Sequence, residues 1–437
     1  MGIAIDKFKV EKYSSYKDSG VQWLREIPEH WEVRKGKWLF IKQERPAKKE
    51  DGIITCFRDG QVTLRTNRKT EGFTIALKEH GYQGIRKGDL VIHNMDAFAG
   101  AIGISDSDGK STPVYSACTP RIANRVNPYY YAYFLKDLAK SGFIESLAKG
   151  IRERSTDFRF NDFGLLLLSV PPLPEQTAIA AFLDCKTTLI DQAISIKQKQ
   201  IELLKERRQI LIHKAVTRGL NPNVKMKDSG VEWIGEIPEH WKVLSNKNIF
   251  KLKKNQVGKK SGDYVLLSLT LNGVIKRDME NPQGKFPAEF NTYQEVKKGD
   301  FIFCLFDVEE TPRCVGLSDF DGMITGAYTV MESTKIFDKN FLYYYFIDID
   351  ERKRLKYLYT GLRNTITKDN FFSLKIVIPS FQEQKEISCA IRNTEDKIFT
   401  AISLKEQEIA KLKEYKATLI NSAVTGKIKV YNDAKQN

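Results

Sequence analysis

The chain contains little cysteine, histidine or proline: six, five and fourteen residues among 437. Its cysteines are Cys56, Cys118, Cys185, Cys304, Cys314 and Cys389. They form no Cys-x-x-Cys motif and no Cys/His pair at zinc-ligand spacing, which excludes a disulfide scaffold or a zinc finger and predicts reduced, structural thiols and no metal.

Long apolar runs are also lacking. No stretch approaches the ~18 apolar residues that a membrane-spanning helix needs. The longest run, Leu165 to Leu168 with Val170, predicts a buried strand, and Met1 to Tyr13 has no apolar signal core. We therefore expect a cytoplasmic protein with no membrane partner.

Signatures of catalysis are scarce. Gly103 to Ser111 resembles a phosphate-binding loop, but five residues separate its glycines where the motif has four. Asn127 to Tyr130 and Glu295 to Lys297 match only parts of methyltransferase and nuclease motifs. His30 and His240 recur in both halves of the chain without a nucleophile or metal partner, which favours a shared packing or hydrogen-bonding role. We expect no catalytic residue and no cofactor.

Positive charge is abundant: 70 Lys and Arg face 55 Asp and Glu, a net charge of +15. An excess of this size favours a polyanionic partner. The basic residues cluster in two places, around Asn67 and in the second half of the chain. The clusters are Arg65, Arg68 and Lys69, and Lys253, Lys254, Lys259 and Lys260.

The sequence contains an internal repeat. The opening segment Lys17 to Trp31 recurs as Lys227 to Trp241 with three positions changed. Two copies of one module predict two similar sites.

A seven-residue apolar ladder follows each module, with the same spacing of 4, 7, 4, 7, 3 and 7 residues in both copies. Such a narrow stripe is typical of a helix that pairs with another helix. The chain order of module, helix, module, helix then predicts an antiparallel coiled coil and an approximate two-fold axis. The stripe residues are Ile179, Leu183, Ile190, Ile194, Ile201, Leu204 and Leu211 in the first helix, and Ile387, Ile391, Ile398, Ile402, Ile409, Leu412 and Leu419 in the second.

Each module has a shared frame with divergent loops. The turn and apolar strand at Arg86 to Ile92 match Val296 to Phe303, after which the sequences differ. They differ again at Gly150 to Ser155 and Gly361 to Thr365. This pattern predicts two readers of different DNA sequences, in which arginines contact phosphates and neighbouring side chains contact base edges. Ordinary surface loops remain the alternative. The candidates are His93, Asn94, Asp96, Arg152, Arg154, Asp307, Glu309, Thr311, Arg313, Arg363 and Asn364.

The repeated opening segment, the motif VPPLPEQ at Val170 to Gln176 and the helix end Leu211 to Thr217 resemble the specificity subunit of type I restriction-modification systems. The resemblance extends from about Lys17 to Lys429. In the second copy Ile378 to Gln384 replaces the proline-rich motif and keeps its Glu-Gln as Glu383 and Gln384, which leaves the start of the second helix open.

This resemblance implies an α+β fold of two similar α/β target recognition domains separated by a pseudo-two-fold, circularly closed antiparallel coiled coil. The expected domains are 1–172 for the first recognition domain, 173–220 for the central helix, 221–380 for the second recognition domain, and 381–437 for the C-terminal helix and tail. Circular closure predicts that the N-terminal segment lies beside the end of the second helix.

The resemblance also implies a non-catalytic subunit that binds double-stranded DNA and two methyltransferase subunits, with restriction subunits joining for cleavage. S-adenosylmethionine, ATP and Mg²⁺ would then belong to those partners. The polar faces of the helices, among them Lys205, Arg207, Arg208, Lys411, Lys413 and Lys416, are candidates for subunit contacts. A stand-alone bivalent DNA-binding or architectural protein would show the same repeats and charge, and stays open.

Overall fold

The computed structural model describes residues 11–68, 81–147, 157–278, 290–361 and 363–430. The chain forms two compact units. Unit 1 comprises Met1–Lys197 and Gln407–Asn437, and unit 2 comprises Gln198–Glu406. Each unit therefore contains one module and a part of each long helix, whereas the sequence-based domains follow one another along the chain.

Unit 1 is built on a four-stranded antiparallel sheet in the order β4-β11-β8-β9. Helix α2 contacts β8 and β9 and buries Tyr130, Tyr131 and Phe134 completely. Asn127 caps this helix by accepting a 3.0 Å hydrogen bond from the Tyr129 N–H. The elements are β1 (Tyr16–Asp18), β2 (Glu26–Pro28), β3 (Glu32–Lys35), α1 (Gly36–Leu39), β4 (Phe40–Lys42), β5 (Ile54–Cys56), β6 (Val62–Leu64), η1 (Arg65–Asn67), β7 (Gln83–Ile85), β8 (Leu90–His93), η2 (Ala97–Ala99), β9 (Ile102–Ile104), β10 (Gly109–Ser111), β11 (Tyr115–Pro120), α2 (Pro128–Lys140), α3 (Phe143–Ser146), α4 (Phe160–Leu165) and β12 (Leu167–Val170).

Unit 2 repeats this plan with the sheet order β16-β23-β20-β21. Its core is an aromatic cluster in which Phe303 packs against Phe250, Phe346 and Phe371. The elements are β13 (Met226–Asp228), β14 (Glu236–Pro238), β15 (Lys242–Ser245), η3 (Asn246–Asn248), β16 (Phe250–Leu252), η4 (Gly258–Asp263), β17 (Leu267–Thr270), β18 (Gly273–Lys276), β19 (Gln294–Val296), β20 (Phe301–Phe303), β21 (Val315–Leu317), β22 (Gly322–Ile324), β23 (Thr329–Ser333), α6 (Lys339–Glu351), η5 (Lys356–Leu358), α7 (Lys368–Ser373) and β24 (Lys375–Ile378).

One sequence expectation about the first module is corrected. Leu165 ends helix α4 and is 60% exposed, so the predicted buried strand begins only at Leu167. The residue before it, Gly164, and Phe163 are the last buried positions of that short helix. Apolar composition alone does not distinguish a short strand from the end of a helix.

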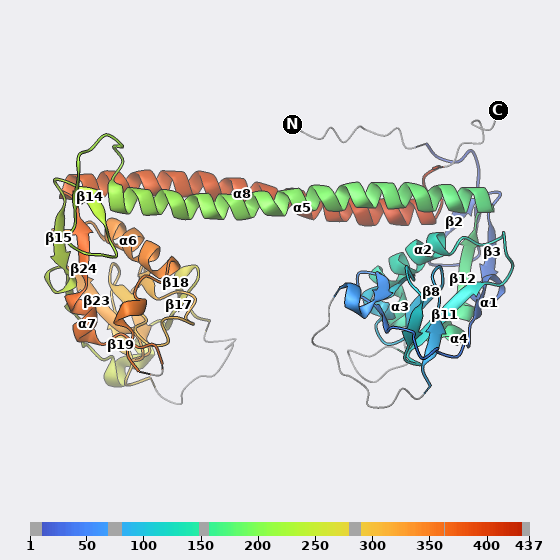
Figure 1. Ribbon diagram of the computed structural model, residues 1–437, viewed down its shortest axis with the longest axis horizontal. Coiled ribbons are helices and arrows are strands. Elements are labelled where there is room, and N and C mark those ends of the chain that lie inside the picture. Colours follow the sequence, from blue (N-terminus) through green and yellow to red (C-terminus); the bar gives the residue numbers. More distant parts are fainter. Residues whose placement is uncertain (1–10, 69–80, 148–156, 279–289, 362, 431–437) are drawn as a thin grey trace. The chain divides into compact units, whose positions relative to one another are not determined.

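The two long helices, α5 (Leu173–Arg218) and α8 (Phe381–Val424), pack together (Figure 1). Within unit 1, Asp191 pairs with Lys416 at 2.7 Å and Lys197 pairs with Glu408 at 2.6 Å, so residue numbers rise along one helix while they fall along the other. This confirms the antiparallel coil. The ladder residues are buried, except that Leu204, Leu211 and Leu412 are half-buried. The predicted two-fold axis stays a prediction.

A matched carboxylate joins each long helix to its module. Glu175, in the first turn of α5, lies 2.9 Å from His30 Nε2 and accepts a 3.1 Å hydrogen bond from Trp31 Nε1. In unit 2, Glu383 lies 2.9 Å from His240 Nε2 and accepts a 3.0 Å bond from Trp241 Nε1. The repeated histidines therefore have the shared hydrogen-bonding role that the sequence predicts.

The glutamines that follow these carboxylates act alike as well. Gln176 Oε1 accepts from the Asn127 N–H, and Gln384 Oε1 accepts from the Asp338 N–H, both at 2.8 Å. Each glutamine also donates to a proline carbonyl of the preceding loop. Helix α8 thus begins at Phe381, and the loss of two of the three prolines leaves the Glu-Gln anchor intact.

The described ends of the chain meet in unit 1. The Lys429 N–H donates to the Glu11 carbonyl at 2.8 Å, and the Tyr16 hydroxyl donates to the Gly426 carbonyl at 3.2 Å. Tyr130, from α2, donates to the Val424 carbonyl at the last residue of α8. The N-terminal segment therefore continues past the end of α8, as circular closure predicts.

Candidate nucleic-acid interface

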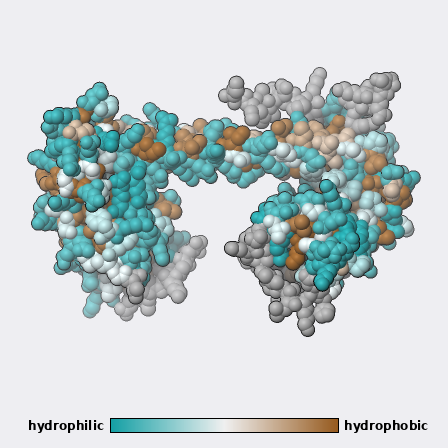
Figure 2. Space-filling view, viewed as in Figure 1, coloured by the Kyte–Doolittle hydropathy of each residue, from teal (hydrophilic) through white to brown (hydrophobic). Residues whose placement is uncertain are grey.

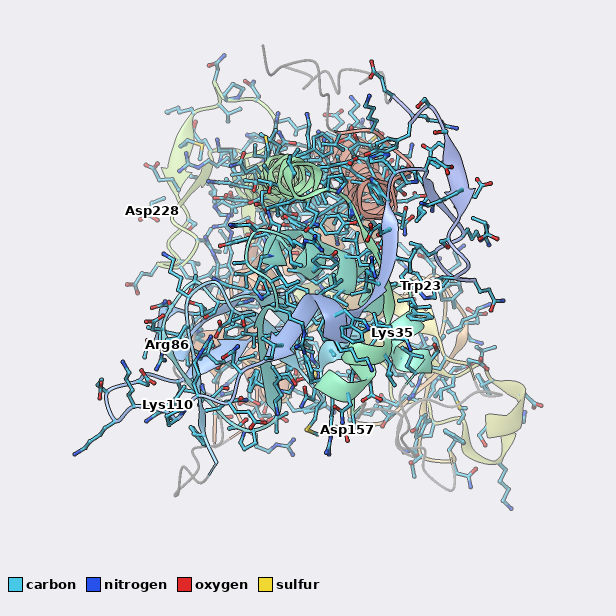
Figure 3. The ribbon with its side chains drawn as sticks, turned by 90° about the vertical axis from the view of Figure 1, so that its right-hand side faces the viewer. Trp23, Lys35, Arg86, Lys110, Asp157 and Asp228 are labelled. Atoms are coloured by element: carbon cyan, nitrogen blue, oxygen red, sulfur yellow. The ribbon has the colours of Figure 1, made fainter. Side chains whose placement is uncertain are left out.

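The frame that carries the candidate loops is the same turn in both units. Asp89 accepts from the Arg86 N–H at 2.8 Å and pairs with Arg45. Gly88, with a φ of +91°, completes this turn, and a residue with a Cβ would be disfavoured in this conformation. Figure 3 shows Arg86 beside Lys110, which belongs to the strand paired with β7; Arg86 donates to the Gly109 carbonyl at 3.1 Å.

In unit 2 the turn is held by the equivalent groups. Asp300 accepts from the Lys297 N–H at 2.7 Å and pairs with Lys253 at 2.6 Å. Lys253 therefore belongs to the frame. Of the basic cluster near it, Lys259 and Lys260 lie exposed on η4.

The structure brings the two divergent loops of unit 2 together, and we call residues 304–314, 359–361 and 363–365 the paired loops. The Asp307 N–H donates to the Arg363 carbonyl at 2.9 Å, and the Val308 N–H donates to the Asn364 carbonyl at 3.3 Å. Next to them, the Ile366 N–H donates to the Leu305 carbonyl at 2.8 Å. Segments separated by more than fifty residues therefore form one surface.

Two ion pairs lie on this surface. Arg363, whose side chain is 72% exposed, makes a two-pronged contact with Asp307, and this hydrogen bonding raises the pKa of Arg363 and lowers that of Asp307. Lys356 pairs with Glu309 at 2.6 Å, which lowers the pKa of Glu309. Exposed arginine and lysine at such a site have the chemistry to contact phosphates or base edges.

Two other candidates of the paired loops face inward. Arg313 is 12% exposed at its side chain and pairs with Glu351 at 3.4 Å and Asp350 at 3.8 Å. The Thr311 hydroxyl lies 3.8 Å from Cys304 Sγ. Both residues support the shape of the loop. Asn364 and Asp307 each adopt a φ of +46°, a left-handed conformation that Asn and Asp tolerate better than most residues.

The corresponding loop of unit 1 is tied to its sheet. Asn94 is buried and accepts a 3.0 Å bond from the Ser116 hydroxyl. His93 Nδ1 accepts from the Asp96 N–H at 3.1 Å, and burial lowers the pKa of His93. The Phe158 N–H donates to the Asn94 carbonyl, just as the Ile366 N–H donates to the Leu305 carbonyl in unit 2. In unit 1 too, therefore, a residue that follows the second divergent segment lies beside the first.

The basic cluster of unit 1 lies on and beside η1. Arg68 pairs with Asp59 at 2.7 Å and stacks on Phe57 at 4.2 Å. Asn67 donates to the Thr63 hydroxyl at 2.9 Å, and Arg65 donates to Thr55 at 3.3 Å. The remaining candidates Lys69, Arg152 and Arg154 lie outside the described residues.

Two exposed cations next to the loops are not predicted from the sequence. Arg58 pairs with Asp96 at 2.9 Å with its side chain 68% exposed, and Lys356 pairs with Glu309 with its side chain 62% exposed. Neither lies in a repeated or divergent segment, so only the folded chain reveals their proximity to the loops.

The coil presents a second apolar stripe. Leu189, Ile196, Leu203 and Ile210 recur every seven residues along α5 and are 42–54% exposed, and Leu404 of α8 is 54% exposed. Figure 2 shows hydrophobic residues gathered along the helices. Because a heptad spacing keeps these residues on one face, the stripe has the pattern of a helix-docking surface. In contrast, Arg208 is 18% exposed at its side chain and is paired within unit 2.

The described part of the chain has no group of three or more His, Cys, Asp or Glu side chains arranged to hold a metal ion. Among the same residues, no helix combines the length and apolarity that a bilayer crossing requires. All six cysteines are free thiols, and Cys185 and Cys389 are exposed.

Two proteins of Methanocaldococcus jannaschii are similar to the chain over most of their length. The putative type I restriction enzyme MjaX specificity subunit is 26% identical and aligns with 93% of this chain and 96% of its own. The type I restriction enzyme MjaVIII specificity subunit is also 26% identical, over 93% of this chain and 95% of its own. No family model matches the sequence.

Solved structures share the fold. A chain in a structure concerning complex assembly and conformational transition of the type I restriction-modification system has a TM-score of 0.65 at 14% identity, covering 91% of this chain and 98% of that one. The HsdS subunit from Thermoanaerobacter tengcongensis has a TM-score of 0.54, also at 14% identity, covering 92% of this chain and 98% of that one.

Proposed function

The chain belongs to the specificity subunits of type I restriction enzymes, and from this premise we propose that units 1 and 2 each read one half of a bipartite DNA sequence. As a specificity subunit it is the non-catalytic recognition component of its complex. Methyl transfer, cleavage, and the binding of S-adenosylmethionine, ATP and Mg²⁺ then belong to partner subunits.

The main support for this proposal is that the divergent loops of both units follow the same conserved turn and strand. Asp89 and Asp300 hold the same turn in both units, whereas the loops that follow differ in length and sequence. In unit 2 both divergent segments meet, with Arg363 and Lys356 exposed on one surface. A constant frame with variable loops suits two readers of different half-sites.

In this proposal, affinity and specificity have separate sources. The net charge of +15 favours duplex binding through phosphate contacts, which makes affinity strongly dependent on salt. Loop side chains that form bidentate contacts with base edges would each discriminate by about 1–3 kcal/mol. Arg363 and Arg58 are exposed enough to contact phosphates, and each is oriented by an aspartate.

We assign the coil two roles. Because Glu175 and Glu383 attach each helix to its module at a matched anchor, the length of α5 and α8 would set the gap between the two half-sites. The exposed stripe from Leu189 to Ile210 would receive helices of two methyltransferase subunits. Restriction subunits would join through that assembly.

The proposal is tested by selecting bound sequences from a random duplex library, using the chain alone and the chain reconstituted with the methyltransferase subunit of its own system. We expect a two-part motif with a constant gap, bound tightly only by the reconstituted complex. Equal affinity and selectivity of the chain alone would instead support a stand-alone bivalent DNA-binding protein. A single uninterrupted motif would refute the two-reader proposal.

A further inference from the structure

Lys353 of unit 2 occupies a backbone position that ordinarily belongs to glycine. It follows the 13-residue helix α6 by two residues and has a φ of +47°. The same position after the 13-residue helix α2 of unit 1 is Gly142, with a φ of +77°. Both residues donate their N–H to the carbonyl three residues earlier, Asp350 at 3.0 Å and Ala139 at 3.1 Å.

A lysine in this conformation is strained, because a Cβ disfavours the left-handed region. Glycine would form the same helix end without that cost. The side chain of Lys353 makes contacts that Gly142 of unit 1 cannot make. Strained residues of this kind mark places where the surrounding contacts hold a functional geometry.

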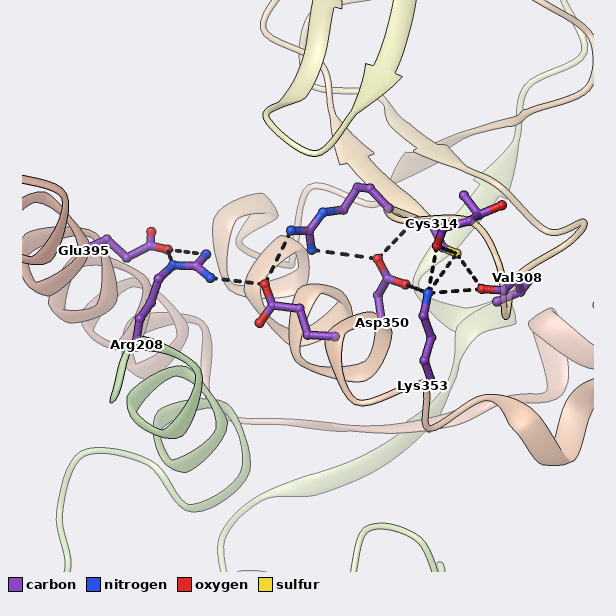
Figure 4. A network of polar contacts seen from close by, with 9 residues as sticks. Arg208, Val308, Cys314, Asp350, Lys353 and Glu395 are labelled. Atoms are coloured by element: carbon purple, nitrogen blue, oxygen red, sulfur yellow. Dashed lines mark hydrogen bonds and ion pairs between the residues drawn. The ribbon is translucent and has the colours of Figure 1, made fainter. Parts of the chain in front are cut away.

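The ammonium group of Lys353 lies inside the paired loops. Nζ donates to the Val308 carbonyl at 3.1 Å and to the Thr311 carbonyl at 2.9 Å, and it pairs with Asp350 Oδ1 at 2.9 Å (Figure 4). Cys314 Sγ lies 3.9 Å away. One amine therefore contacts both ends of the segment 308–311, which lies in a turn closed by the Thr311 N–H donating to the Asp307 carbonyl at 2.9 Å.

Asp350 holds the end of the same loop. Its Oδ2 accepts a 2.8 Å hydrogen bond from the Cys314 N–H and lies 3.8 Å from Arg313 NH1. The carboxylate is 5% exposed, so solvent cannot replace these contacts without local opening. Lys353 and Asp350 together seat the loop on the C-terminal end of α6.

The contacts continue from the loop to the coil within unit 2. Arg313 NH2 lies 3.4 Å from Glu351, which pairs with Arg208 of α5 at 3.1 Å. Arg208 Nε donates in turn to Glu395 of α8 at 2.6 Å (Figure 4). A continuous chain of charged contacts thus joins the paired loops to both long helices.

Unit 1 lacks this arrangement at the matching positions. Lys140 stands at the last residue of α2, where α6 has Glu351, and Ala139 precedes it, where α6 has Asp350. The loop of unit 1 between β8 and β9 is also two residues shorter, since Ile92 pairs with Ile102 whereas Phe303 pairs with Val315. The shorter loop contains η2 and is supported by its own side chains, with Asn94 bonded to Ser116 and His93 bonded to the Asp96 N–H.

We propose that Lys353 is a specificity-positioning residue that holds segment 308–314 in the shape with which unit 2 discriminates its half-site. Asp350, Arg313, Glu351 and Arg208 extend this support to the coil. The inference rests on the proposed function, because it assigns the paired loops to base reading. It predicts that the half-site of unit 2 depends on a residue that contacts no base.

The test compares two variants that remove the amine in different ways. Lys353→Gly removes it and relieves the backbone strain, and Lys353→Met removes it while keeping a long side chain. Arg352→Gly is the matched control, because Arg352 is the adjacent residue, pairs with Asp348 at 2.9 Å and has no contact with the loop among the described interactions. Bound sequences are selected with the reconstituted complex, and amide hydrogen exchange is measured over residues 304–314.

For both Lys353 variants we expect faster exchange over 304–314 and about a tenfold loss of base discrimination in the half-site of unit 2, the size of one lost bidentate contact. The other half-site and the gap should stay unchanged. Arg352→Gly should leave both half-sites, the gap and the exchange of residues 304–314 unchanged. Lys353→Gly should be less destabilised than Lys353→Met, because both lose the contacts of the amine but only the glycine relieves the backbone strain.

Unchanged half-site selectivity in a folded Lys353→Gly variant would overturn the proposal. An equal loss at both half-sites would do the same, because it would indicate a structural role alone. If the wild-type complex selects no two-part motif, the proposed function fails, while the exchange of residues 304–314 still reports whether Lys353 holds the loop.

Discussion

The matched anchors of the long helices lead to a prediction in which two equivalent substitutions have unequal effects. Glu175 is 3% exposed at its side chain and accepts hydrogen bonds from Tyr13, from the fully buried Trp31 and from His30. Burial beside this carboxylate raises the pKa of Tyr13 well above its usual value, so its hydroxyl stays a donor. Glu383 is 24% exposed and accepts from His240 and Trp241.

Replacing Glu175 with alanine leaves two donors of low exposure without an acceptor, each costing ~1–3 kcal/mol, and we expect unit 1 to lose about 3 kcal/mol. Replacing Glu383 with alanine leaves one such donor in a site that water can reach, so unit 2 should lose about 1 kcal/mol. Because the substitutions are chemically identical, the difference isolates the effect of burial and of the extra donor from Tyr13.

Urea denaturation monitored by amide hydrogen exchange separates the two units, through peptides that cover 26–35 and 236–245. The Glu175→Ala variant should lower the opening free energy of the first peptide by about three times as much as Glu383→Ala lowers that of the second. Equal losses, or a larger loss in unit 2, would contradict the expectation that burial and the extra donor from Tyr13 strengthen the anchor of unit 1.

Three further outcomes are expected. Because burial lowers the pKa of His93, its neutral form should contribute its full stability to unit 1 above about pH 6.5, and this contribution should be lost as the pH falls through the lowered pKa. A His93→Gln variant with the same urea midpoints from pH 5 to 7.5 as wild type would contradict this. Arg363→Ala should reduce the slope of log affinity against log salt by about 1 if Arg363 contacts a phosphate, whereas Lys413→Ala on the coil should leave it unchanged. The double substitution Ile196→Asp and Leu203→Asp should abolish co-purification with a methyltransferase subunit without unfolding the chain, because both side chains are more than half exposed; an intact complex would exclude the stripe as the docking face.

Periodic features of the fold were predictable from the sequence, because they depend on repeated local patterns. The ladder from Ile179 to Leu211 identifies the helix and its buried face, and the duplicated segment identifies the two modules. The role of His30 and His240 follows from the same repetition. Local pattern failed at Leu165, where an apolar run continues from the end of a helix into a strand.

The candidate surface was predictable only as a set of loops. Sequence comparison between the two modules identifies where they diverge, but the contact of Asp307 with Arg363 depends on the tertiary fold. Arg313 is predicted as a reader and faces inward, toward Glu351. The role of Lys353 depends on a backbone angle that no composition or spacing indicates.

Under the proposed function, a coil of defined length separates the two readers. The most direct test maps methylated adenines across a host genome for the reconstituted system and for a variant with seven residues inserted after Lys197 and seven after Glu406. A heptad keeps the apolar register and lengthens each helix by about 10 Å, close to three base pairs of duplex. We predict the same two half-sites separated by a gap about three base pairs longer. An unchanged gap would exclude the coil as the element that sets the spacing.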